Sequence, residues 1–360
     1  MTRMQTWPAD AGTVASRLRS ARGGRRCGSK GSSMFQRALT RLSLVLLAVL
    51  ATVACADGPP GPGSAAPAAA APAAVPDTAA RTRPATAGDA VPRAQRRNCA
   101  RRPSRCGYPD ATNTGVPDGT TLRSSGSIDA DRDGMVIDGR DVRGEINVTA
   151  SNVTIKNTRV TGGRGIGPAD WVIIIRPGAE NLRIVDSTIL TPSGSPQDIA
   201  CVFNIGESRP WIQRVDISGC SAGVSTGGGT VRDSYIHDMA QVAGLSHDVG
   251  IASNGGGGLQ VRHNTIFNQL DQTATVAMYQ DFGGQRDNVV RRNLLAGGGY
   301  CVYGGAGDTA TRNIRFIRNR FSRRYHPRCG YYGVVASFDR RDPGNVWREN
   351  VWDDTLRPAG

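Results

Sequence analysis

A short pattern of apolar and polar positions recurs through residues 152–352 of this chain. Each copy has apolar residues at alternate positions, then an Asn or Asp, and then a second apolar stretch. Clear copies are NVTIKNTRV (152–160), NLRIVDSTIL (181–190), LQVRHNTI (259–266), NVVRRNLL (288–295) and NIRFIRNRF (313–321). Alternation of apolar and polar residues predicts short β-strands with one buried face. No segment has the spacing of an amphipathic helix.

The polar residue of each copy predicts a turn between two strands. It falls at eight positions, Asn157, Asp186, Asp216, Asp233, Asn264, Asn293, Asn319 and Asn350. Asn and Asp tolerate the left-handed backbone angles that such a bend requires. Most of these positions are about 26–31 residues apart, so each interval corresponds to one coil of a repeat. We expect their side chains to form a hydrogen-bonded ladder from coil to coil.

Stacked coils of this length predict an all-β fold, a right-handed parallel β-helix of about eight or nine coils. Each coil is expected to hold two or three short strands, and glycine clusters supply further corners at 227–229, 255–258, 283–284 and 297–299. A β-propeller needs longer four-stranded blades, and a leucine-rich repeat needs its own frame of Leu and Asn. Neither pattern is present. We therefore place the β-helix domain at residues 98–360.

Residues 1–56 have the features of an export signal. Their apolar segment, Leu42–Ala54, is shorter than the roughly 20 residues that a membrane-spanning helix needs. Arg37 and Arg41 precede this segment and small residues follow it, which is the layout of a secretory signal with Met34 as the working start. The sequence therefore predicts export of the folded domain.

Two processing routes fit the end of this signal. Residues 52–55 (TVAC) resemble a bacterial lipobox, in which Cys55 is lipidated; alternatively, cleavage before Asp57 releases the protein. Residues 57–97 are rich in Ala and Pro and have almost no large apolar side chains, so burial cannot offset the entropy of ordering them. We expect a disordered tether there, and membrane contact only through the lipid anchor.

The formal charge of +14 suggests a polyanion partner, but the distribution of this charge along the chain does not support one. Residues 1–56 contain nine basic residues and one acid, and residues 57–106 contain eight basic residues and three acids. The remaining 27 basic and 26 acidic residues leave 107–360 with a net charge of +1. The folded part is almost neutral, which argues against a nucleic-acid partner.

The cysteines agree with export. Apart from Cys27 and Cys55 there are six, Cys99, Cys106, Cys201, Cys220, Cys301 and Cys329. An even number in an oxidising compartment indicates disulfides. Proximity in the sequence favours the pairs 99–106, 201–220 and 301–329, one of 15 possible connectivities. The chain has no C-x-x-C pair, so a zinc ribbon or a thioredoxin-like redox site is not supported.

Together these residues resemble the right-handed parallel β-helix proteins of the pectate-lyase-like superfamily. The resemblance covers residues 107–360 and is greatest with exported bacterial members at CGYPDATNTGVPDGTTL (106–122), VIDGRDV (136–142) and NVTIKN (152–157). It implies the β-helix fold and a carbohydrate-directed role. The superfamily includes lyases, glycosidases, epimerases, phage tailspikes and adhesins, so the fold leaves the chemistry open.

A candidate catalytic site lies in the glycine-rich half of the repeat. The segment SHDVGI (246–251) resembles the His-x-Asp-Gly-Ile element of many β-helix proteins, with Val249 added, and supplies His247 and Asp248. Asp281, one coil later, has a similar offset from its ladder residue, so we expect both carboxylates on one flank. Coils about 4.8 Å apart would then bring them within about 5–10 Å, the range used by glycosidases.

Further residues are candidates for binding a sugar polymer. Tyr279 and Tyr303 can stack on sugar rings, and His237 is a second candidate acid or base. Arg318 lies in a run of arginines at 312–328, which favours either a grip on an acidic polymer or a solvated face. Alternatively, all of these Asp and His side chains cap turns of the coils.

Metal binding has little support in the sequence. Asp129, Asp131 and Asp133 resemble the start of a calcium-binding loop, but Arg140 stands where that loop needs a bidentate Glu. The alternative is an exposed acidic turn. We expect no cofactor and no metal, with calcium at this loop as the exception to test.

Two functions fit these observations. One is an exported enzyme, a lyase or hydrolase that acts on a polysaccharide in a groove along the coils. The other is a non-catalytic polysaccharide binder or adhesin, expected to be a monomer. Convergence of Asp248, Asp281 and a His in an open groove favours the enzyme, and dispersed acids favour the binder.

Overall fold

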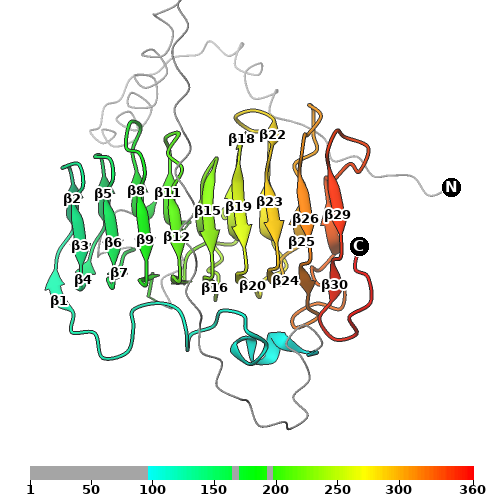
Figure 1. Cartoon of the computed structure of the whole chain (residues 1–360), viewed down its shortest axis with the longest axis horizontal. Coiled ribbons are helices and arrows are strands. Elements are labelled where there is room, and N and C mark those ends of the chain that lie inside the picture. Colours follow the sequence, from blue (N-terminus) through cyan, green and yellow to red (C-terminus); the bar gives the residue numbers. More distant parts are fainter. Residues whose placement is uncertain (1–95, 164–169, 193–197) are drawn as a thin grey trace, which may run out of the picture. The chain divides into compact units, whose positions relative to one another are not determined.

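The computed structural model describes residues 96–163, 170–192 and 198–360 (Figure 1). The predicted leader, with Cys55, and the predicted tether up to residue 95 lie outside the described residues. The described residues belong to one compact unit, Pro84–Gly360. Within them, no helix has the length and apolar character that crossing a membrane requires.

Three parallel sheets form the walls of the domain. Sheet A has ten strands, β1 (Arg123–Ser125), β4 (Arg140–Arg143), β7 (Arg159–Thr161), β10 (Thr188–Leu190), β13 (Asp216–Ser218), β16 (Tyr235–His237), β20 (Thr265–Asn268), β24 (Leu294–Gly297), β27 (Arg320–Phe321) and β30 (Val351–Trp352). Sheet B has nine strands, β2 (Ile128–Ala130), β5 (Ile146–Val148), β8 (Trp171–Ile175), β11 (Ala200–Asn204), β14 (Ala222–Ser225), β17 (Val249–Ser253), β21 (Ala274–Met278), β25 (Tyr300–Tyr303) and β28 (Gly333–Ala336). Sheet C has nine strands, β3 (Val136–Asp138), β6 (Thr154–Lys156), β9 (Arg183–Val185), β12 (Trp211–Gln213), β15 (Gly229–Arg232), β19 (Leu259–Arg262), β23 (Val289–Arg291), β26 (Arg315–Ile317) and β29 (Val346–Arg348).

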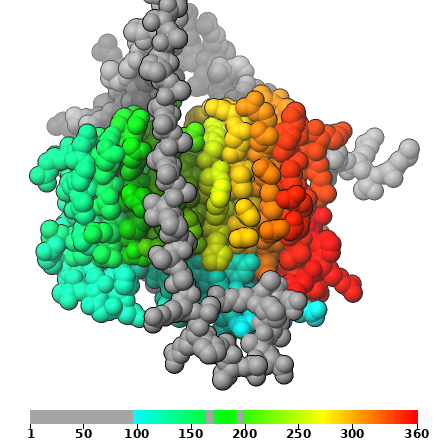
Figure 2. Space-filling model, viewed as in Figure 1, coloured from blue at the N-terminus to red at the C-terminus, as the bar shows by residue number. Residues whose placement is uncertain are grey.

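Each strand pairs with the strands one coil before and one coil after it, because the chain visits sheets B, C and A in turn. Figure 2 shows the successive coils as adjacent bands of colour. A small extra sheet of β18 (Gly256–Gly257) and β22 (Gln285–Arg286) extends two coils at the corner between sheets B and C. Among the described residues, two short 3-10 helices, η2 (Cys99–Arg101) and η3 (Pro103–Cys106), precede the first strand. The predicted all-β parallel β-helix is confirmed.

Columns of apolar side chains, one from each coil, fill the interior. In sheet C the strand register aligns Ile155, Ile184, Ile212, Val231, Val261, Val290 and Phe316. All seven are fully buried. Most are β-branched, and such side chains are stiff and pack well on a pleated surface. The alternation seen in the sequence is therefore the inward and outward alternation of these strands.

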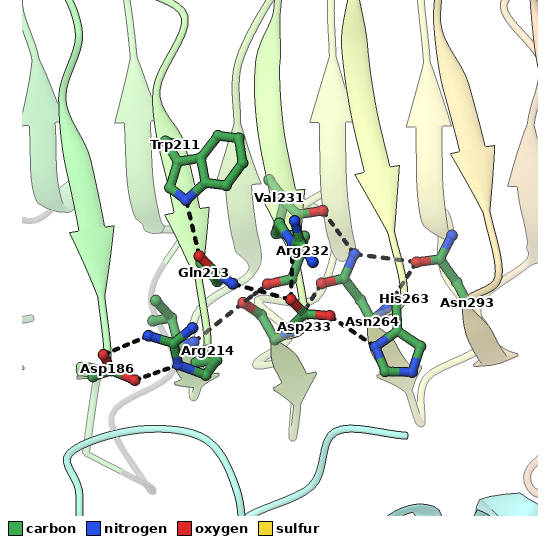
Figure 3. Close-up of polar contacts among 12 residues, drawn as sticks. Asp186, Trp211, Gln213, Arg214, Val231, Arg232, Asp233, His263, Asn264 and Asn293 are labelled. Carbon is green, nitrogen blue, oxygen red and sulfur yellow. Dashed lines mark hydrogen bonds and ion pairs between the residues drawn. The ribbon is translucent and has the colours of Figure 1, made fainter. Parts of the chain in front are cut away.

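The turn from sheet C to sheet A contains one left-handed residue in each coil. In eight successive coils it is Asn157, Asp186, Arg214, Asp233, His263, Arg292, Arg318 and Glu349, with φ between 48° and 56°. Several of these side chains pair along the surface (Figure 3). Arg214 binds Asp186 through Nε at 2.6 Å and Nη2 at 2.7 Å, and His263 Nδ1 lies 2.8 Å from Asp233 Oδ1.

The residue that follows is buried and points into the coil. These residues are Thr158, Ser187, Val215, Ser234, Asn264, Asn293, Asn319 and Asn350. The backbone N–H of Asn264 donates to Oδ1 of Asn293 at 2.9 Å, and Asn293 repeats this toward Asn319 at 3.0 Å. The Nδ2 group of Asn264 also donates to Asn293 Oδ1 at 3.1 Å, which Figure 3 shows. Asparagines thus form a continuous ladder in the last four coils.

The predicted ladder is wrong in the earlier coils, where it mixes two adjacent positions of the turn. Asn157, Asp186 and Asp233 occupy the left-handed position, and Asp216 is the first residue of β13. Hydroxyl groups replace the asparagine amides in this half. The backbone N–H of Val215, for example, donates to Ser234 Oγ at 3.1 Å. Val215 itself supplies no side-chain acceptor, so the polar column is interrupted there.

An N-terminal strap, residues 96–122, connects the last coil to the first along sheet A (Figure 1). Near its start, the N–H of Asn98 donates to the Asp353 carbonyl at 2.9 Å, and that of Ala100 donates to Asp353 Oδ2 at 2.9 Å. Further along, the N–H of Gly115 donates to the Arg214 carbonyl at 3.0 Å. The strap then enters β1, so both ends of the domain are tied to the same segment.

The six cysteines of the domain lie in the three predicted pairs, Cys99–Cys106, Cys201–Cys220 and Cys301–Cys329. The first pair closes the start of the strap. The second and third each connect a strand of sheet B to the next coil. Loops of this size stabilise a fold by about 2–4 kcal/mol when they are closed.

Replacing Asn293 with Leu should destabilise the domain by about 1–3 kcal/mol, because the buried N–H of Asn264 loses its acceptor. Urea unfolding measures this. The matched control is Arg292→Lys at the neighbouring exposed position, which should change the free energy of unfolding by less than about 0.5 kcal/mol. Equal midpoints for Asn293→Leu and the parent would contradict the ladder.

Asp353 is expected to be among the most sensitive positions. Its side chain is 2% exposed and lies 3.3 Å from Arg320 Nη1, whose side chain is 7% exposed. Asp353→Ala leaves a buried guanidinium without its carboxylate, which should cost about 3–5 kcal/mol. Asp354→Ala removes the exposed ion pair with Arg323 next to it and should cost less than about 1 kcal/mol. Similar losses of stability for the two variants would refute the role of Asp353.

Candidate functional site

A groove crosses the outer face of sheet B. Alternation in the strands turns Val202, Val224, Ile251 and Val276 inward, which leaves small residues facing outward. The register places Ala200 beside Ala222 and Ser225 beside Ala252. With no large side chain on these positions, the sheet surface is open to a ligand. Small outward residues run from Ser225 through Ala252 to Ala277 at one register, and Phe203 borders them on the preceding coil.

The groove has a volume of about 580 Å³. Its lining consists of Asp170, Asp198, Ile199, Ala200, Phe203, Ser221, Ala222, Ser225, His247, Val249, Ala252, Asn254, Tyr279 and Asp281. Three of the predicted site residues, His247, Tyr279 and Asp281, are therefore in one groove. The acids Asp170 and Asp198 belong to it as well, and sequence reasoning missed them.

His247 and Asp281 occupy opposite ends of the groove. His247 precedes β17, and Asp281 follows β21, whose strands run parallel with Val249 beside Ala274 and Ser253 beside Met278. The two side chains are therefore separated by the length of a strand, roughly 15–20 Å at about 3.3 Å per residue. Both residues are exposed. The groove thus has one end with His247 and one end with Asp281.

The expected convergence of Asp248 and Asp281 is wrong for the same reason. Asp248 immediately precedes β17, whereas Asp281 comes three residues after the end of β21. Asp248 is also fully buried and does not line the groove. The offsets counted along the chain run through turns of different length, so equal counts do not give equal positions on the coil. The catalytic roles of these residues stay predictions.

Asp248 is instead an internal carboxyl with few partners. Ser246 Oγ donates to its Oδ1 at 2.7 Å, and no described group hydrogen-bonds to its Oδ2 with normal geometry. Burial raises the pKa of this carboxyl from 3.8 to about 6, although the hydrogen bond from Ser246 opposes the shift. The negative charge of Asp198 at the groove end acts in the same direction as burial.

At that end, acids from two earlier coils border the groove together with His247. Asp170 precedes β8 and Asp198 precedes β11 by two residues, so both lie where strands of sheet B begin. Ser221 Oγ, just before β14, donates to Asp198 Oδ1 at 2.8 Å. Both acids are exposed. Two carboxylates and an imidazole therefore border the groove at the start of the strands.

A row of aromatic side chains continues the groove over the later coils. The ring centroids of Tyr279 and Tyr303 are 6.0 Å apart, those of Tyr303 and Tyr300 are 5.6 Å apart, and those of Tyr300 and Tyr332 are 5.7 Å apart. Tyr331 and Tyr332 are 51% and 58% exposed. Burial raises the pKa of Tyr279 and of Tyr303, so both hydroxyls stay protonated at neutral pH. The row offers flat apolar faces with hydroxyl groups at their edges.

Two other predicted binding residues lie outside the groove. His237 is on β16 in sheet A, with Nε2 3.0 Å from Asp216 Oδ1 and Nδ1 2.8 Å from Asp238 Oδ2. Burial lowers the pKa of His237, but the two carboxylates outweigh it and the net pKa is raised. Arg318 is in the turn between sheets C and A and pairs with Glu349.

The predicted arginine stripe does not form one binding face. Arg320 is buried against Asp353, Arg323 pairs with Asp354 at 2.6 Å, and Arg312 lies 3.7 Å from Asp287. Structural ion pairs therefore account for much of this run of arginines. Polymer binding stays a prediction only for the other arginines of the run.

No metal site is visible in the part of the chain that the structure describes. No group of three or more His, Cys, Asp or Glu side chains there is placed to hold a metal ion. In the predicted calcium loop, Asp129 Oδ1 accepts a hydrogen bond from Asn147 Nδ2 at 3.0 Å, and Asp133 Oδ1 accepts one from the Ser151 N–H at 2.8 Å. These carboxylates join neighbouring coils.

Comparison with known proteins adds no relative to this description. A scan of protein-family models matches none, and searches of the curated proteins and of the solved structures find no match.

Asp248→Asn should remove part of the pH dependence of stability. The folded protein binds a proton at Asp248 below about pH 6, whereas the unfolded carboxyl does so near 3.8. The parent therefore loses stability as pH rises from about 4 to 6. The neutral amide of the variant has no such loss. Between pH 4 and 7 the free energy of unfolding of the variant should therefore rise by about 1–3 kcal/mol relative to that of the parent.

Urea unfolding at pH 4, 5, 6 and 7 measures this difference. Asp281→Asn, at an exposed carboxyl on the other end of the groove, is the control and should follow the parent. Parallel stability profiles for the parent and Asp248→Asn would show that the Asp248 pKa is not raised.

Proposed function

We propose that this chain is an exported polysaccharide-binding protein whose ligand lies along the outer face of sheet B. The observation that carries the proposal is the combination of a floor of small residues with a row of tyrosines on the same face. A sugar polymer is an extended chain of rings with apolar faces and hydroxyl edges. Tyrosines at successive coils match such rings, and the alanine floor leaves room for them.

The stacking of coils gives the groove its length. Tyr279, Tyr303 and Tyr332 come from three successive coils, which are about 4.8 Å apart in a β-sheet. A ligand that contacts all three crosses the strands and spans several sugar units. A small molecule would use one of these contacts, so the row favours a polymer over a monosaccharide.

Export is supported by the sequence at the N-terminus and by three cysteine pairs, which are stable in an oxidising compartment. The resemblance to exported members of the pectate-lyase-like superfamily supports both export and the carbohydrate-directed role. We propose a monomer that is either lipid-anchored through Cys55 or freely secreted, without a nucleic-acid partner or a cofactor.

Binding without catalysis is the first form of the proposal. Asp248 is buried and Asp281 lies a strand length from His247, so the acids of the predicted catalytic site are dispersed. Glycoside hydrolysis needs two carboxyl groups about 5–10 Å apart on either side of the scissile bond. The predicted pair does not meet this requirement.

Hydrolysis at the other end of the groove is the second candidate function. Asp170 and Asp198 border it from adjacent coils, and a coil spacing of about 4.8 Å is compatible with a glycosidase pair. His247, two coils after Asp198, lines the same end of the groove and is a further acid or base. In this form one carboxyl group protonates the leaving oxygen, and the other attacks the sugar carbon or activates water.

Replacing either of two tyrosines in the row, Tyr279 or Tyr303, should weaken polysaccharide binding. Tyr279→Ala and Tyr303→Ala are each expected to raise the Kd at least fivefold, since aromatic side chains at the centre of a binding site contribute about 1 kcal/mol or more. The matched control is Trp211→Ala on the outer face of sheet C. Affinity electrophoresis in gels that contain a panel of polysaccharides measures the effect.

Retention of parental affinity by both tyrosine variants, or an equal loss in Trp211→Ala, would move the binding face away from sheet B. Assays of reducing ends and unsaturated products over the same panel test catalysis. If products appear, Asp170→Asn and Asp198→Asn should abolish them while binding persists, and unchanged rates in both variants would exclude this acid pair.

A further inference from the structure

A second cavity opens at the Asp281 end of the groove. It has a volume of about 530 Å³ and lies at the corner between sheets B and C. Figure 1 shows β18 and β22, which extend the coils at this corner. Phe203, Ser225 and Asn254 line both this cavity and the groove. A polymer in the groove therefore reaches the second cavity without leaving the surface. We call it the corner pocket.

Glycines make the wall of the corner pocket bare backbone. Gly227, Gly228 and Gly255–Gly257 are part of its lining. Gly256 has φ of 96°, and a Cβ there would lie 3.0 Å from the Gly227 carbonyl oxygen. A Cβ on Gly258, with φ of 75°, would lie 2.3 Å from Arg209 Nη1. The cluster thus gives the Arg209 guanidinium a position directly against the main chain.

Two arginines line the corner pocket, Arg209 from the segment before β12 and Arg286 from β22. Neither side chain makes an ion pair or a hydrogen bond with a described residue. Other arginines of the domain differ: Arg214 and Arg323, for example, each hold a carboxylate at 2.6 Å. Glu207 is the acid of the lining, and it lies beyond ion-pair distance from both arginines. The lining carries a net charge of +1.

Ser208 places a buried hydroxyl without a partner in the wall of the corner pocket. Its side chain is 4% exposed and lines the corner pocket, yet its Oγ has no hydrogen-bond partner among the described residues. A buried hydroxyl without a partner costs about 1–3 kcal/mol, and such groups are rare in folded proteins. The Oγ atom is buried, so rotation of the side chain to another rotamer is needed for it to donate to a ligand oxygen in the pocket.

Phe282 completes the lining with an apolar surface. It is 85% exposed, and its backbone N–H donates to the Asn254 carbonyl at 2.7 Å, which fixes the loop next to the pocket. At this exposure the ring of Phe282 is accessible to a ligand that enters the pocket. The face of a sugar ring fits it, with the ring substituents directed at the arginines.

We propose that the corner pocket binds a carboxylate or sulfate group on a sugar unit of the polysaccharide. Arg209 and Arg286 hold the anionic oxygens, Ser208 Oγ donates a hydrogen bond, and Phe282 covers the ring. Arginine suits this task because its planar guanidinium forms paired hydrogen bonds with oxyanions. This inference rests on the proposed function in one respect, that the anion is carried by a polymer lying in the groove.

Small probes test the pocket independently of the groove. Galacturonate and sodium sulfate are titrated against the exported protein at low ionic strength, with Arg Nε–H signals as the NMR readout. At least one probe should shift two arginine signals, which Arg209→Gln and Arg286→Gln identify by their loss. Arg262→Gln, at an exposed arginine on β19, is the matched control and should leave the response unchanged. Absence of any shift with both probes would overturn the proposal.

Oligosaccharides then test whether the bound anion belongs to a sugar polymer. Galacturonan carries carboxylates, carrageenan carries sulfates, and galactan is neutral, so the three arms distinguish the two anions. We expect at least tenfold tighter binding of one acidic oligomer than of galactan. The double variant Arg209→Gln, Arg286→Gln should lose this preference and keep its affinity for galactan. Glu207→Gln should strengthen acidic binding, because it removes the negative charge of the lining.

The outcomes separate the two proposals. Equal binding of acidic and neutral oligomers, or a preference that survives the double variant, would refute the corner pocket and leave the groove intact. Binding of the small probes without binding of any oligomer would refute the groove and support the pocket as an anion site. Circular dichroism and melting midpoints check that each variant is folded, which is expected because both arginines are exposed.

Discussion

The structure depends on a single requirement at the turn from sheet C to sheet A. There the chain leaves one sheet and enters the next, so a buried backbone N–H has no strand partner and needs an acceptor from the following coil. Asn293, Asn319 and Asn350 supply it with amide oxygens, and Ser187 and Ser234 supply it with hydroxyls. This contact aligns neighbouring coils, except at Val215, where the column is interrupted. The alignment in turn places the small outward residues of sheet B in one groove.

The fold could be predicted because its signal is repeated many times. Alternating apolar residues specify strands with one buried face, and eight copies fix the stacking. The ladder was harder to locate, because Asp and Asn suit both the left-handed position and the buried position after it. In Asp233-Ser234 the acid takes the first position, whereas in Arg292-Asn293 the asparagine takes the second. Which of the two adjacent residues takes the buried position depends on which side chain fits the interior of the coil.

The site could be predicted only in part. His247, Tyr279 and Asp281 line the groove, because turns next to glycine-rich coils are open to solvent. Asp170 and Asp198 escaped notice since nothing in the repeat marks the residues before a strand of sheet B. The corner pocket could not be predicted without knowing the path of the backbone. Its arginines, Arg209 and Arg286, are far apart in sequence, and the fold alone shows that no described carboxylate pairs with them.

Amide hydrogen exchange, measured on the protein with and without an oligosaccharide that it binds, tests the account most directly. We expect slower exchange in β11, β14, β17 and β21 and in the segments 226–228, 254–258 and 279–286 that surround the groove and the corner pocket. The turn from sheet C to sheet A should be unchanged. Protection confined to the outer faces of sheet A or sheet C, with sheet B unaffected, would contradict it.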